Sequence, residues 1–263
     1  MTSFRADMTF VANGTEKPAF ITQEYGTPSI RRGAFETRPV WIHDGRVADE
    51  AFDLDSHGFA LLSHTSDIHD FENPEENTSV YYEEISAIVR QYLGAKHVYI
   101  IDHTIRYSEK KPGERRVVTH VHNDYTEKSG PERLREHVGD ALADDLLGRR
   151  IVQVNVWRPL TEPVRVAPLA VVNGSSVPFE DLVRCDIVYP DRVGEIYELR
   201  FSAAHRWYWF PEMHCDEIIL IKGYDSEKDG RVRFTPHTAF DHPHTKPSDP
   251  PRISIEVRTI AVV

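Results

Sequence analysis

Short apolar segments rich in β-branched and aromatic residues dominate the C-terminal half of the chain. They read IVQVNVW, PLAVVN, CDIVYP, EIYELRF, HRWYWF, DEIILIKGYD, RVRFTPH and RISIEVRTIAVV. Polar and glycine-containing stretches such as NGSS, DRVG and SEKDGR lie between them. Because β-branched and aromatic residues favour strands and such polar clusters favour turns, this half is predicted to be mainly antiparallel β structure.

Two segments have the spacing of helices. From Thr78 to Leu93 apolar residues recur every three or four positions, after the cap-like NPEENTS and before Gly94. This pattern predicts a helix. A second helix is predicted over residues 131–147, because it begins with proline, has one apolar face and is followed by Gly148.

The N-terminal half contains further strand signals. GFALLS, residues 58–63, is short and apolar and predicts a buried strand. HVYIIDHTIRY and VVTHVH, residues 97–107 and 117–122, predict two more strands, with a turn at KKPGERR, residues 110–116. Residues 1–50 mix Pro, Gly, Thr and charges and are expected to form extended arms and turns.

The order of these elements indicates the fold class. Two helices followed by many short strands predict an α+β domain with a double-stranded β-helix core, a jelly-roll or cupin-like barrel with flanking helices. A length of 263 residues fits a single catalytic domain over 1–263. We expect residues 1–50 to be an N-terminal arm and 95–263 the jelly-roll core. The proline-rich residues 241–251 predict a surface loop that can cover a site or contact a substrate.

Composition narrows the functional classes. The formal charge is −11, from 31 basic and 42 acidic residues, which opposes binding to a nucleic-acid backbone. A local basic pocket for a small dicarboxylate stays open. Only Cys185 and Cys215 are present, so a disulfide framework is excluded and a reducing, cytoplasmic location is expected. The sequence has no signal-peptide pattern and no apolar run near 18 residues, so no membrane insertion is expected.

The sequence His122-Asn123-Asp124, at the end of a predicted strand, carries the first candidate chemistry. Residues two apart on an extended strand point to the same side, so this imidazole and carboxylate can share one metal. Two His and one carboxylate on one face leave positions for a keto acid and O₂, the arrangement expected for Fe(II). The candidates for the third ligand are His205, His214, His237, His242 and His244.

We favour His237, because FTPHTAF places it at a predicted strand end and PRISIEVR follows it. In that segment Arg252 and Ser254 lie on one strand face and can bind a carboxylate together, the guanidinium through paired charge-assisted bonds. The order His-x-Asp, distant His, Arg-x-Ser is more specific than any of its parts. His205 is the chief rival, although no Arg-x-Ser follows it at a comparable distance.

Neighbouring strands add further candidates. In VNVWRPL, Asn155 and Trp157 face one way and Arg158 the other, so Arg158 either binds substrate or cosubstrate or lies beside a packed tryptophan. The aromatic residues of HRWYWF more often build core than bind ligand. His120 shares a strand face with His122 and can orient a ligand, replace one, or simply be solvated.

Several of these segments together resemble one enzyme family. They are HVHNDY, VNVWRPL, HRWYWF, DEIILIKGYDS, FTPHTAF and PPRISIEVR. In order and spacing they are similar to the family that groups aspergillic-acid-type hydroxylase/desaturases with gibberellin-desaturase-like and cephem 7α-methoxylation-related proteins. The resemblance covers about residues 95–263.

The resemblance implies an Fe(II)/2-oxoglutarate-dependent oxygenase that uses O₂ and hydroxylates or desaturates a small molecule of secondary metabolism. By motif match, His122, Asp124 and His237 are expected to bind iron and Arg252 to bind 2-oxoglutarate. Fungal members often have Gln at the position of Tyr125, so the resemblance does not carry substrate identity.

The site expected from these observations has three parts. Its iron ligands are His122, Asp124 and His237. Its cosubstrate-binding residues are Arg252, Ser254, Arg158 and Asn155. Its candidate substrate contacts are Tyr125, Trp157, His205 and Arg258.

Two other functions stay as alternatives. One is a redox-silent, metal-binding cupin-like enzyme in which His120 and His122 serve as ligands. The other is a non-catalytic β-sandwich binding protein, which is disfavoured because buried imidazoles need partners. We expect a small-molecule substrate and neither nucleic acid nor membrane as partner. The oligomeric state is left open, with a homodimer as one alternative.

Overall fold

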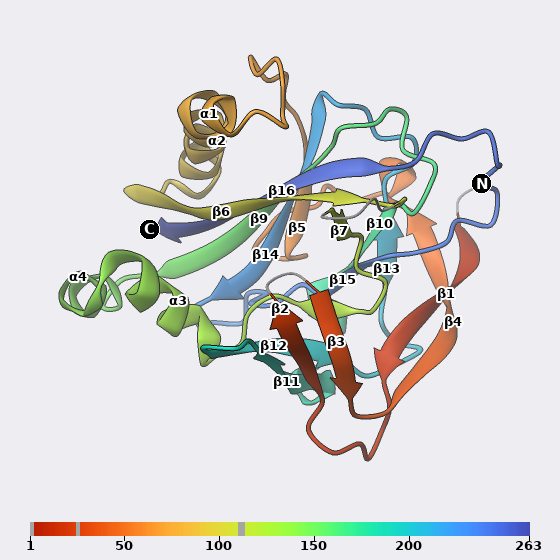
Figure 1. Cartoon of the computed structure of the whole chain (residues 1–263), viewed down its shortest axis with the longest axis horizontal. Helices are drawn as coiled ribbons and strands as arrows, with labels where there is room; N and C mark the ends of the chain where they lie inside the picture. Colours follow the sequence, from red (N-terminus) through yellow and green to blue (C-terminus); the bar gives the residue numbers. More distant parts are fainter. Residues whose placement is uncertain (1–2, 25–26, 110–113) are drawn as a thin grey trace.

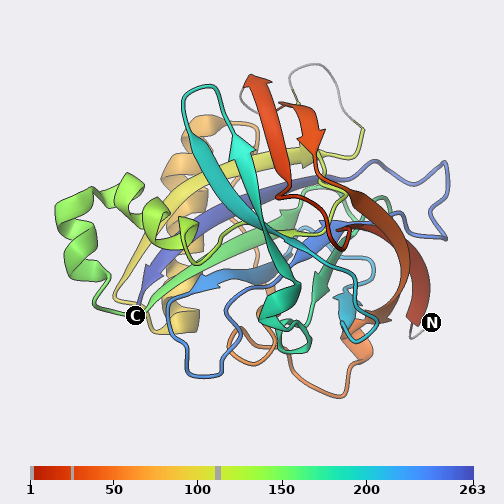
Figure 2. The same cartoon turned by 90° about the horizontal axis from the view of Figure 1, so that it is seen from below.

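The computed structural model describes residues 3–24, 27–109 and 114–263, and in this part of the chain two β-sheets face each other (Figures 1 and 2). Sheet A has ten strands. In spatial order they are β1 (Ser3–Val11), β4 (Phe35–Asp44), β13 (Trp207–Trp209), β10 (Leu169–Val172), β15 (His237–Ala239), β8 (His122–Asn123), β12 (Val193–Leu199), β11 (Leu182–Val188), β2 (Ala19–Glu24) and β3 (Thr27–Arg32). The predicted turn at residues 110–116 lies mostly outside the described residues.

Sheet B has six strands in the same part of the chain. In spatial order they are β5 (Phe59–Ser63), β14 (Glu217–Asp225), β9 (Ile151–Pro159), β16 (Ile253–Val262), β6 (His97–Tyr107) and β7 (Arg115–Arg116). β16 pairs antiparallel with both β9 and β6. Curled sheets of this kind confirm the predicted jelly-roll core, and helices flank it as expected (Figure 1).

The long helical segment covers the outer face of sheet B. It consists of α1 (Pro74–Glu76), a π-helical turn η2 (Asn77–Tyr81) and α2 (Tyr82–Leu93). The side chain of Asn73 accepts a hydrogen bond from the backbone amide of Glu75 at 2.9 Å, and Gly94 ends the helix at φ 64°. Both residues are of the types that cap helices. The spacing therefore predicted this helix correctly, although it begins a few residues earlier.

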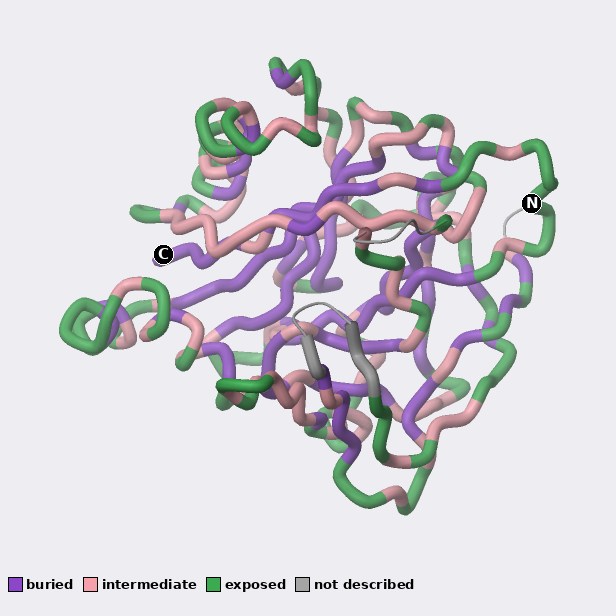
Figure 3. Tube along the Cα trace, viewed as in Figure 1, coloured by how far each residue is buried: buried purple, intermediate pink, exposed green. Residues whose placement is uncertain are grey.

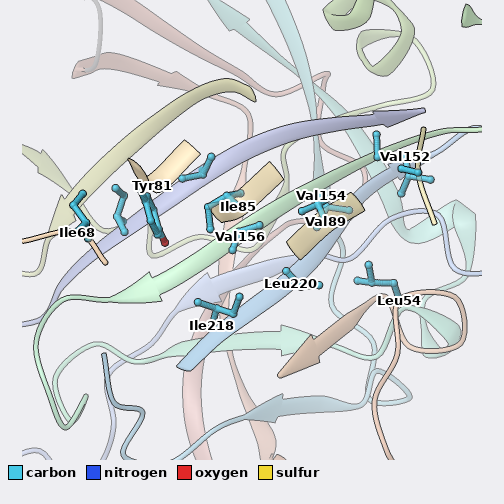
Figure 4. Close-up of a cluster of buried hydrophobic side chains, with 14 residues drawn as sticks. Leu54, Ile68, Tyr81, Ile85, Val89, Val152, Val154, Val156, Ile218 and Leu220 are labelled. Carbon is cyan, nitrogen blue, oxygen red and sulfur yellow. The ribbon is translucent and has the colours of Figure 1, made fainter. Parts of the chain in front are cut away.

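An apolar cluster lies between this helix and sheet B. Figure 4 shows side chains of the helix, among them Tyr81 and Ile85, against valines of β9 and apolar residues of β14. The buried members are Leu54, Ile68, Tyr81, Ile85, Val89, Ala95, Val152, Val154, Val156, Ile218, Leu220, Ile255, Val257 and Ala261. β9 is buried along its whole length (Figure 3). One of its faces is covered by the helix, and the other points into the interior of the barrel.

The predicted second helix is two helices, so that prediction was wrong in its continuity. α3 (Ser129–Val138) and α4 (Asp140–Leu146) meet at Gly139. The backbone of Gly139 has φ 81° and ψ 158°, and its amide closes the last turn of α3. Glycine adopts such a positive φ at little cost, so the chain turns there. Short 3₁₀ turns complete the helical structure at η1 (Gly45–Val47), η3 (Gly174–Ser176) and η4 (Phe179–Asp181).

Two predicted strands are mostly irregular. Of the predicted strand over residues 117–122, only His122 lies in a strand, the two-residue β8 that it forms with Asn123. The segment 231–237 is likewise not a strand, and His237 begins β15 instead of ending a strand. Pro236 has no amide to donate, and the amide of Thr235 donates to the side-chain oxygen of Asn123 at 2.9 Å. Here hydrogen bonds to side chains and loops take the place of the backbone hydrogen bonds between paired strands.

Most of the described residues among the first 50 form strands of sheet A instead of extended arms and turns. β1 alternates buried and exposed residues and pairs with β4 along its length. Phe4, Met8 and Phe10 pack into a second apolar cluster with Trp207 and Trp209. These residues therefore belong to the core of the domain. None of the helices in the described parts of the chain is long and apolar enough to cross a membrane.

Candidate active site

Three side chains converge between β8 and β15, near the middle of sheet A. His122 and His237 are direct partners in the antiparallel pair β8–β15, so their side chains leave the sheet on the same face. Asp124 follows β8 and returns to that face two residues after His122. One ligand atom from each of the three residues lies within 4.8 Å of the others. Within the described residues this is the one group of His, Cys, Asp and Glu with metal-binding geometry.

Backbone carbonyls orient both imidazoles. Nδ1 of His122 lies 3.0 Å from the carbonyl oxygen of His120, and Nδ1 of His237 lies 3.1 Å from that of Thr235. A carbonyl accepts only, so in each ring Nδ1 carries the proton and Nε2 keeps its lone pair. Burial lowers the pKa of His122 to about 3, with His237 adding to the effect. His122 is therefore neutral and ready to bind a metal.

The carboxylate of Asp124 is fixed at one oxygen. Its Oδ2 accepts a hydrogen bond from the side-chain amide of Asn155 at 2.5 Å, and its Oδ1 lies 3.6 Å from Nε2 of His122. Burial raises the pKa of Asp124, but His122, His237 and Arg258 together with the Asn155 bond outweigh it and hold this pKa below its usual value. Two imidazoles and one carboxylate form a donor set that fits a divalent transition metal such as Fe(II).

A row of polar side chains on β16 lies opposite this group. Ser254, Glu256 and Arg258 alternate on the inner face of sheet B, and Arg258 pairs in register with Asn155 of β9. The Nε of Arg258 donates to Asp102 at 2.6 Å. Burial raises the pKa of Glu256, with the nearby charge of Asp124 adding to it. The barrel interior between the sheets is therefore strongly polar around the three converging residues.

Arg252 continues this row of polar side chains, two residues before Ser254. It is 2% exposed, its guanidinium carbon lies 5.5 Å from the ring centre of Trp157, and it donates one hydrogen bond to the carbonyl of Ala167. Its buried Nε has no hydrogen-bond partner among the described residues. Burial lowers the pKa of Arg252 to about 9, and Arg106 adds to this. A buried cation with an unused donor is suited to bind an anion.

Among the candidates from sequence, Arg158 and His205 are not brought to this group. Arg158 lies on the outer face of sheet B, where it donates to the hydroxyl of Tyr81 at 3.0 Å and to the carbonyls of His64 and Cys215. Alternation along the strand allowed Arg158 to face either way. The expectation that it faces inward and binds the cosubstrate is therefore wrong. His205, the rival ligand, pairs with Asp181 at 2.9 Å away from the three residues.

His120 and Glu198 form a buried pair beside the group. Nδ1 of His120 lies 2.9 Å from the carboxylate of Glu198, which is fully buried, and the ring of His120 stacks on Phe20. Burial raises the pKa of Glu198 to about 8. Glu198 is not among the residues that the sequence singled out, and its only signal there is an acidic position inside the otherwise strand-like EIYELRF.

A cavity of about 840 Å³ opens next to His122 and Asp124. Its walls come from β2, β3, β6, β7, β8, α3 and the β11–β12 turn. Tyr125 and Arg258, both candidate substrate contacts, line it. Tyr125 packs against Gly223, where a Cβ would lie only 2.7 Å from its ring. Trp157 and Arg252 are not among its lining residues. A volume of this size suits a small organic molecule.

Comparisons with known proteins agree with this geometry. The family model described as an oxidoreductase/YMDC permease-like domain matches residues 8–262. Hydroxylase/desaturase efuI of Hormonema carpetanum is 30% identical over 262 residues, which cover 90% of this chain and 87% of that protein. Fe(II)/2-oxoglutarate-dependent dioxygenase nvfI of Aspergillus novofumigatus is 32% identical over 232 residues, 84% of this chain and 82% of that protein.

A solved structure is similar over the whole chain. The iron and alpha-ketoglutarate-dependent endoperoxidase NvfI superposes with a TM-score of 0.88 at 28% identity, covering 99% of this chain and 98% of that one. The similarity includes the N-terminal strands as well as the jelly-roll core, so it extends further than the resemblance over residues 95–263.

Proposed function

The chain belongs to the family of Fe(II)- and 2-oxoglutarate-dependent dioxygenases that includes these hydroxylase/desaturases, and from this premise we propose that His122, Asp124 and His237 bind its ferrous ion. The observation that carries the proposal is the convergence of their three ligand atoms within 4.8 Å. The family uses Fe(II) with 2-oxoglutarate and O₂, which favours this function over a redox-silent cupin-like enzyme or a non-catalytic binding protein.

His122, Asp124 and His237 would hold the metal. When bound, the iron with 2-oxoglutarate and O₂ supplies the oxidising power that attacks a C–H bond, and succinate and CO₂ are released. Asn155 keeps Asp124 in its binding orientation through the bond to Oδ2. The carbonyls of His120 and Thr235 do the same for the two imidazoles. Such supporting bonds fix the tautomer and direction of metal ligands.

Arg252 is the proposed partner of the distal carboxylate of 2-oxoglutarate. It is buried in the barrel, it keeps a free Nε donor, and Ser254 lies on the same strand face two residues later. A guanidinium with a hydroxyl beside it can bind both oxygens of a carboxylate. The second buried arginine of this region, Arg158, faces away and has its donors occupied.

The substrate is proposed to enter the cavity beside His122 and Asp124 and to be hydroxylated or desaturated there. The relatives include a protein named for aspirochlorine biosynthesis in Aspergillus oryzae, which supports a role in secondary metabolism. The residues that line the cavity near the metal, Tyr125 and Arg258 among them, are proposed to hold the target carbon and to exclude water.

We further propose that the chain acts as one catalytic domain in the cytoplasm on a small molecule and not on nucleic acid. The formal charge of −11 supports the last point, because phosphate backbones need a basic surface. Sedimentation analysis decides between a monomer and a homodimer.

The test is succinate formation by anaerobically reconstituted protein after O₂ is admitted. Fe(II) with 2-oxoglutarate should give succinate, and Zn(II) in its place should give none. Asp124→Ala should abolish succinate formation, because one of three ligands is lost, while circular dichroism shows an intact fold. Full Fe(II)-dependent activity in that variant would contradict the ligand assignment. Asp181→Ala, which removes the carboxylate beside His205, is the matched control and should retain activity.

A further inference from the structure

Arginines surround the mouth of the cavity although the protein as a whole is acidic. Arg31 comes from β3, Arg115 and Arg116 form β7, and Arg192 lies in the β11–β12 turn. We call these four residues the arginine rim. Arg106 of β6 also lines the cavity and is less exposed than Arg31, Arg115 and Arg116. With Arg133 and Arg258, which also line it, segments that are distant in sequence thus bring seven guanidinium groups to one cavity, in a chain whose formal charge is −11.

The carboxylates of the cavity are engaged elsewhere. Asp102 accepts from Arg258 at 2.6 Å, and Glu136 pairs with Arg133 at 2.6 Å. Glu195 pairs with Lys17 at 3.2 Å. Asp124 is a proposed iron ligand. Within the residues that the structure describes, neither the arginine rim nor Arg106 forms an ion pair with a carboxylate. Their positive charge is therefore available to a ligand.

Two members of the rim lie over aromatic rings. The guanidinium carbon of Arg31 lies 3.2 Å from the ring centre of Phe35 and 5.3 Å from that of Phe20. The guanidinium carbon of Arg192 lies 4.4 Å from the ring centre of Tyr189. Stacking uses the face of a guanidinium and leaves its in-plane N–H groups free to bind an oxyanion.

Arg106 adds a more enclosed positive group. It donates one hydrogen bond to the carbonyl of Arg116 at 3.1 Å. Burial lowers its pKa, and the neighbouring charges of Arg258 and Arg115 act in the same direction. An anion placed near this group would offset both effects.

We propose that the substrate oxidised in this cavity is a carboxylic acid with an apolar body, and that the arginine rim binds its carboxylate. The apolar body would lie against Phe20, Ile30, Val118 and Ile187, which line the same cavity. The inference rests on the proposed function. It is separate from cosubstrate binding, because Arg252 does not line this cavity. An acidic group at the mouth also fixes which carbon of the substrate points to the iron.

The test compares two probes of the same shape that differ in charge, 2-naphthoate and 2-naphthamide. The protein is loaded with Mn(II) and saturated with N-oxalylglycine, so that the metal and cosubstrate positions are filled. Calorimetric titration should give a Kd for 2-naphthoate about tenfold or more below that for 2-naphthamide. In the double variant Arg31→Gln and Arg192→Gln the two Kd values should become similar. Arg90→Gln, on the exposed side of α2, is the charge-matched control and should retain the preference.

Three results overturn the proposal. One is equal affinity for the two probes, or no binding of 2-naphthoate, in the unaltered protein. Another is a preference for 2-naphthoate that persists both in the double variant and in a second double variant, Arg115→Gln with Arg116→Gln. The second double variant also replaces the first if the first does not fold. The third is a loss of 2-oxoglutarate binding in the rim variants, which would assign the rim to the cosubstrate. Absence of Fe(II)-dependent succinate formation in the unaltered protein would instead refute the proposed function and leave the probe result standing.

Discussion

The two faces of β9 and β16 carry opposite kinds of side chain. On the outer face Val154 and Val156 pack with Ile85 of α2 in a continuous apolar cluster. On the inner face Glu256 is buried between the sheets and Arg258 is partly buried. Burial of apolar surface stabilises the fold, whereas buried charged groups cost stability unless they are paired. The same strands therefore stabilise the fold with one face and carry polar side chains of the proposed site on the other.

The largest effect on stability is expected from the outer face. Ile85→Ala removes a fully buried side chain from the cluster between α2 and sheet B, and should lower the free energy of unfolding by about 2 to 5 kcal/mol. Urea unfolding measures the change. Succinate formation per folded molecule should stay the same, because the inner face is untouched.

A loss of iron affinity in Ile85→Ala at temperatures where the protein stays folded would contradict the separation of the two faces. Leu142→Ala is the control for a change of apolar volume at an exposed position of α4. It should shift the free energy of unfolding by no more than about 0.5 kcal/mol.

Two buried arginines, Arg252 on the inner face of sheet B and Arg158 on the outer face, test the difference between the faces directly. Arg252→Met should raise the KM for 2-oxoglutarate, since a charge-assisted hydrogen bond contributes about 1.5 to 3 kcal/mol, which corresponds to about 10- to 150-fold. Arg158→Met should leave this KM unchanged and lower the free energy of unfolding by about 1 to 3 kcal/mol, because the carbonyls of His64 and Cys215 lose their donor. Initial rates of succinate formation and urea unfolding measure the two quantities.

The opposite outcome is also informative. If Arg158→Met raises the KM and Arg252→Met does not, the cosubstrate position assigned to the inner face is wrong. Arg252→Lys should recover part of the affinity, because lysine keeps the charge but cannot form the paired bonds of a guanidinium.

The sequence predicted the elements that have a strong local period. The apolar spacing of residues 78–93, with Gly94 after it, identified the helix over sheet B. The alternation in the last strand placed Arg252 and Ser254 on one face. His122 and Asp124 were selected because two residues of an extended segment share a side, and the structure brings them together with His237. These inferences depended on near neighbours only.

The inferences that failed or were absent depended on contacts between distant segments. Alternation left the direction of Arg158 open, because β9 is buried on both faces and its period does not tell them apart. Pro236 and the side chain of Asn123 interrupted a predicted strand through a contact that no local pattern shows. The arginine rim exists only because β3, β7 and the β11–β12 turn meet at one cavity. Glu198 became visible only when its burial beside His120 was known.

The smallest predicted effect is the loss of stability caused by burying the carboxyl group of Glu198. Folding raises the pKa of Glu198 from 4.5 to about 8 through burial, so between these values the folded protein retains a proton that the unfolded chain releases. The free energy of unfolding should therefore fall as pH rises through this window, and the contribution of Glu198 should be constant below and above it. Glu198→Gln removes the titration. Relative to the unaltered protein, the variant should be more stable by on the order of 1 to 2 kcal/mol at pH 9, and this difference should disappear near pH 4.

Urea unfolding across pH 4 to 9 measures the difference, with Glu83→Gln on the exposed side of α2 as the control for charge. A constant difference between Glu198→Gln and the unaltered protein at all pH values would mean that the carboxyl group ionises normally in the folded state. Burial of Glu198 on the inner face of sheet A would then not lower the stability of the fold as predicted. The predicted profile instead means that the barrel keeps Glu198 against His120 at the expense of stability. Such a cost is expected where a buried polar group supports a site and does not support the fold.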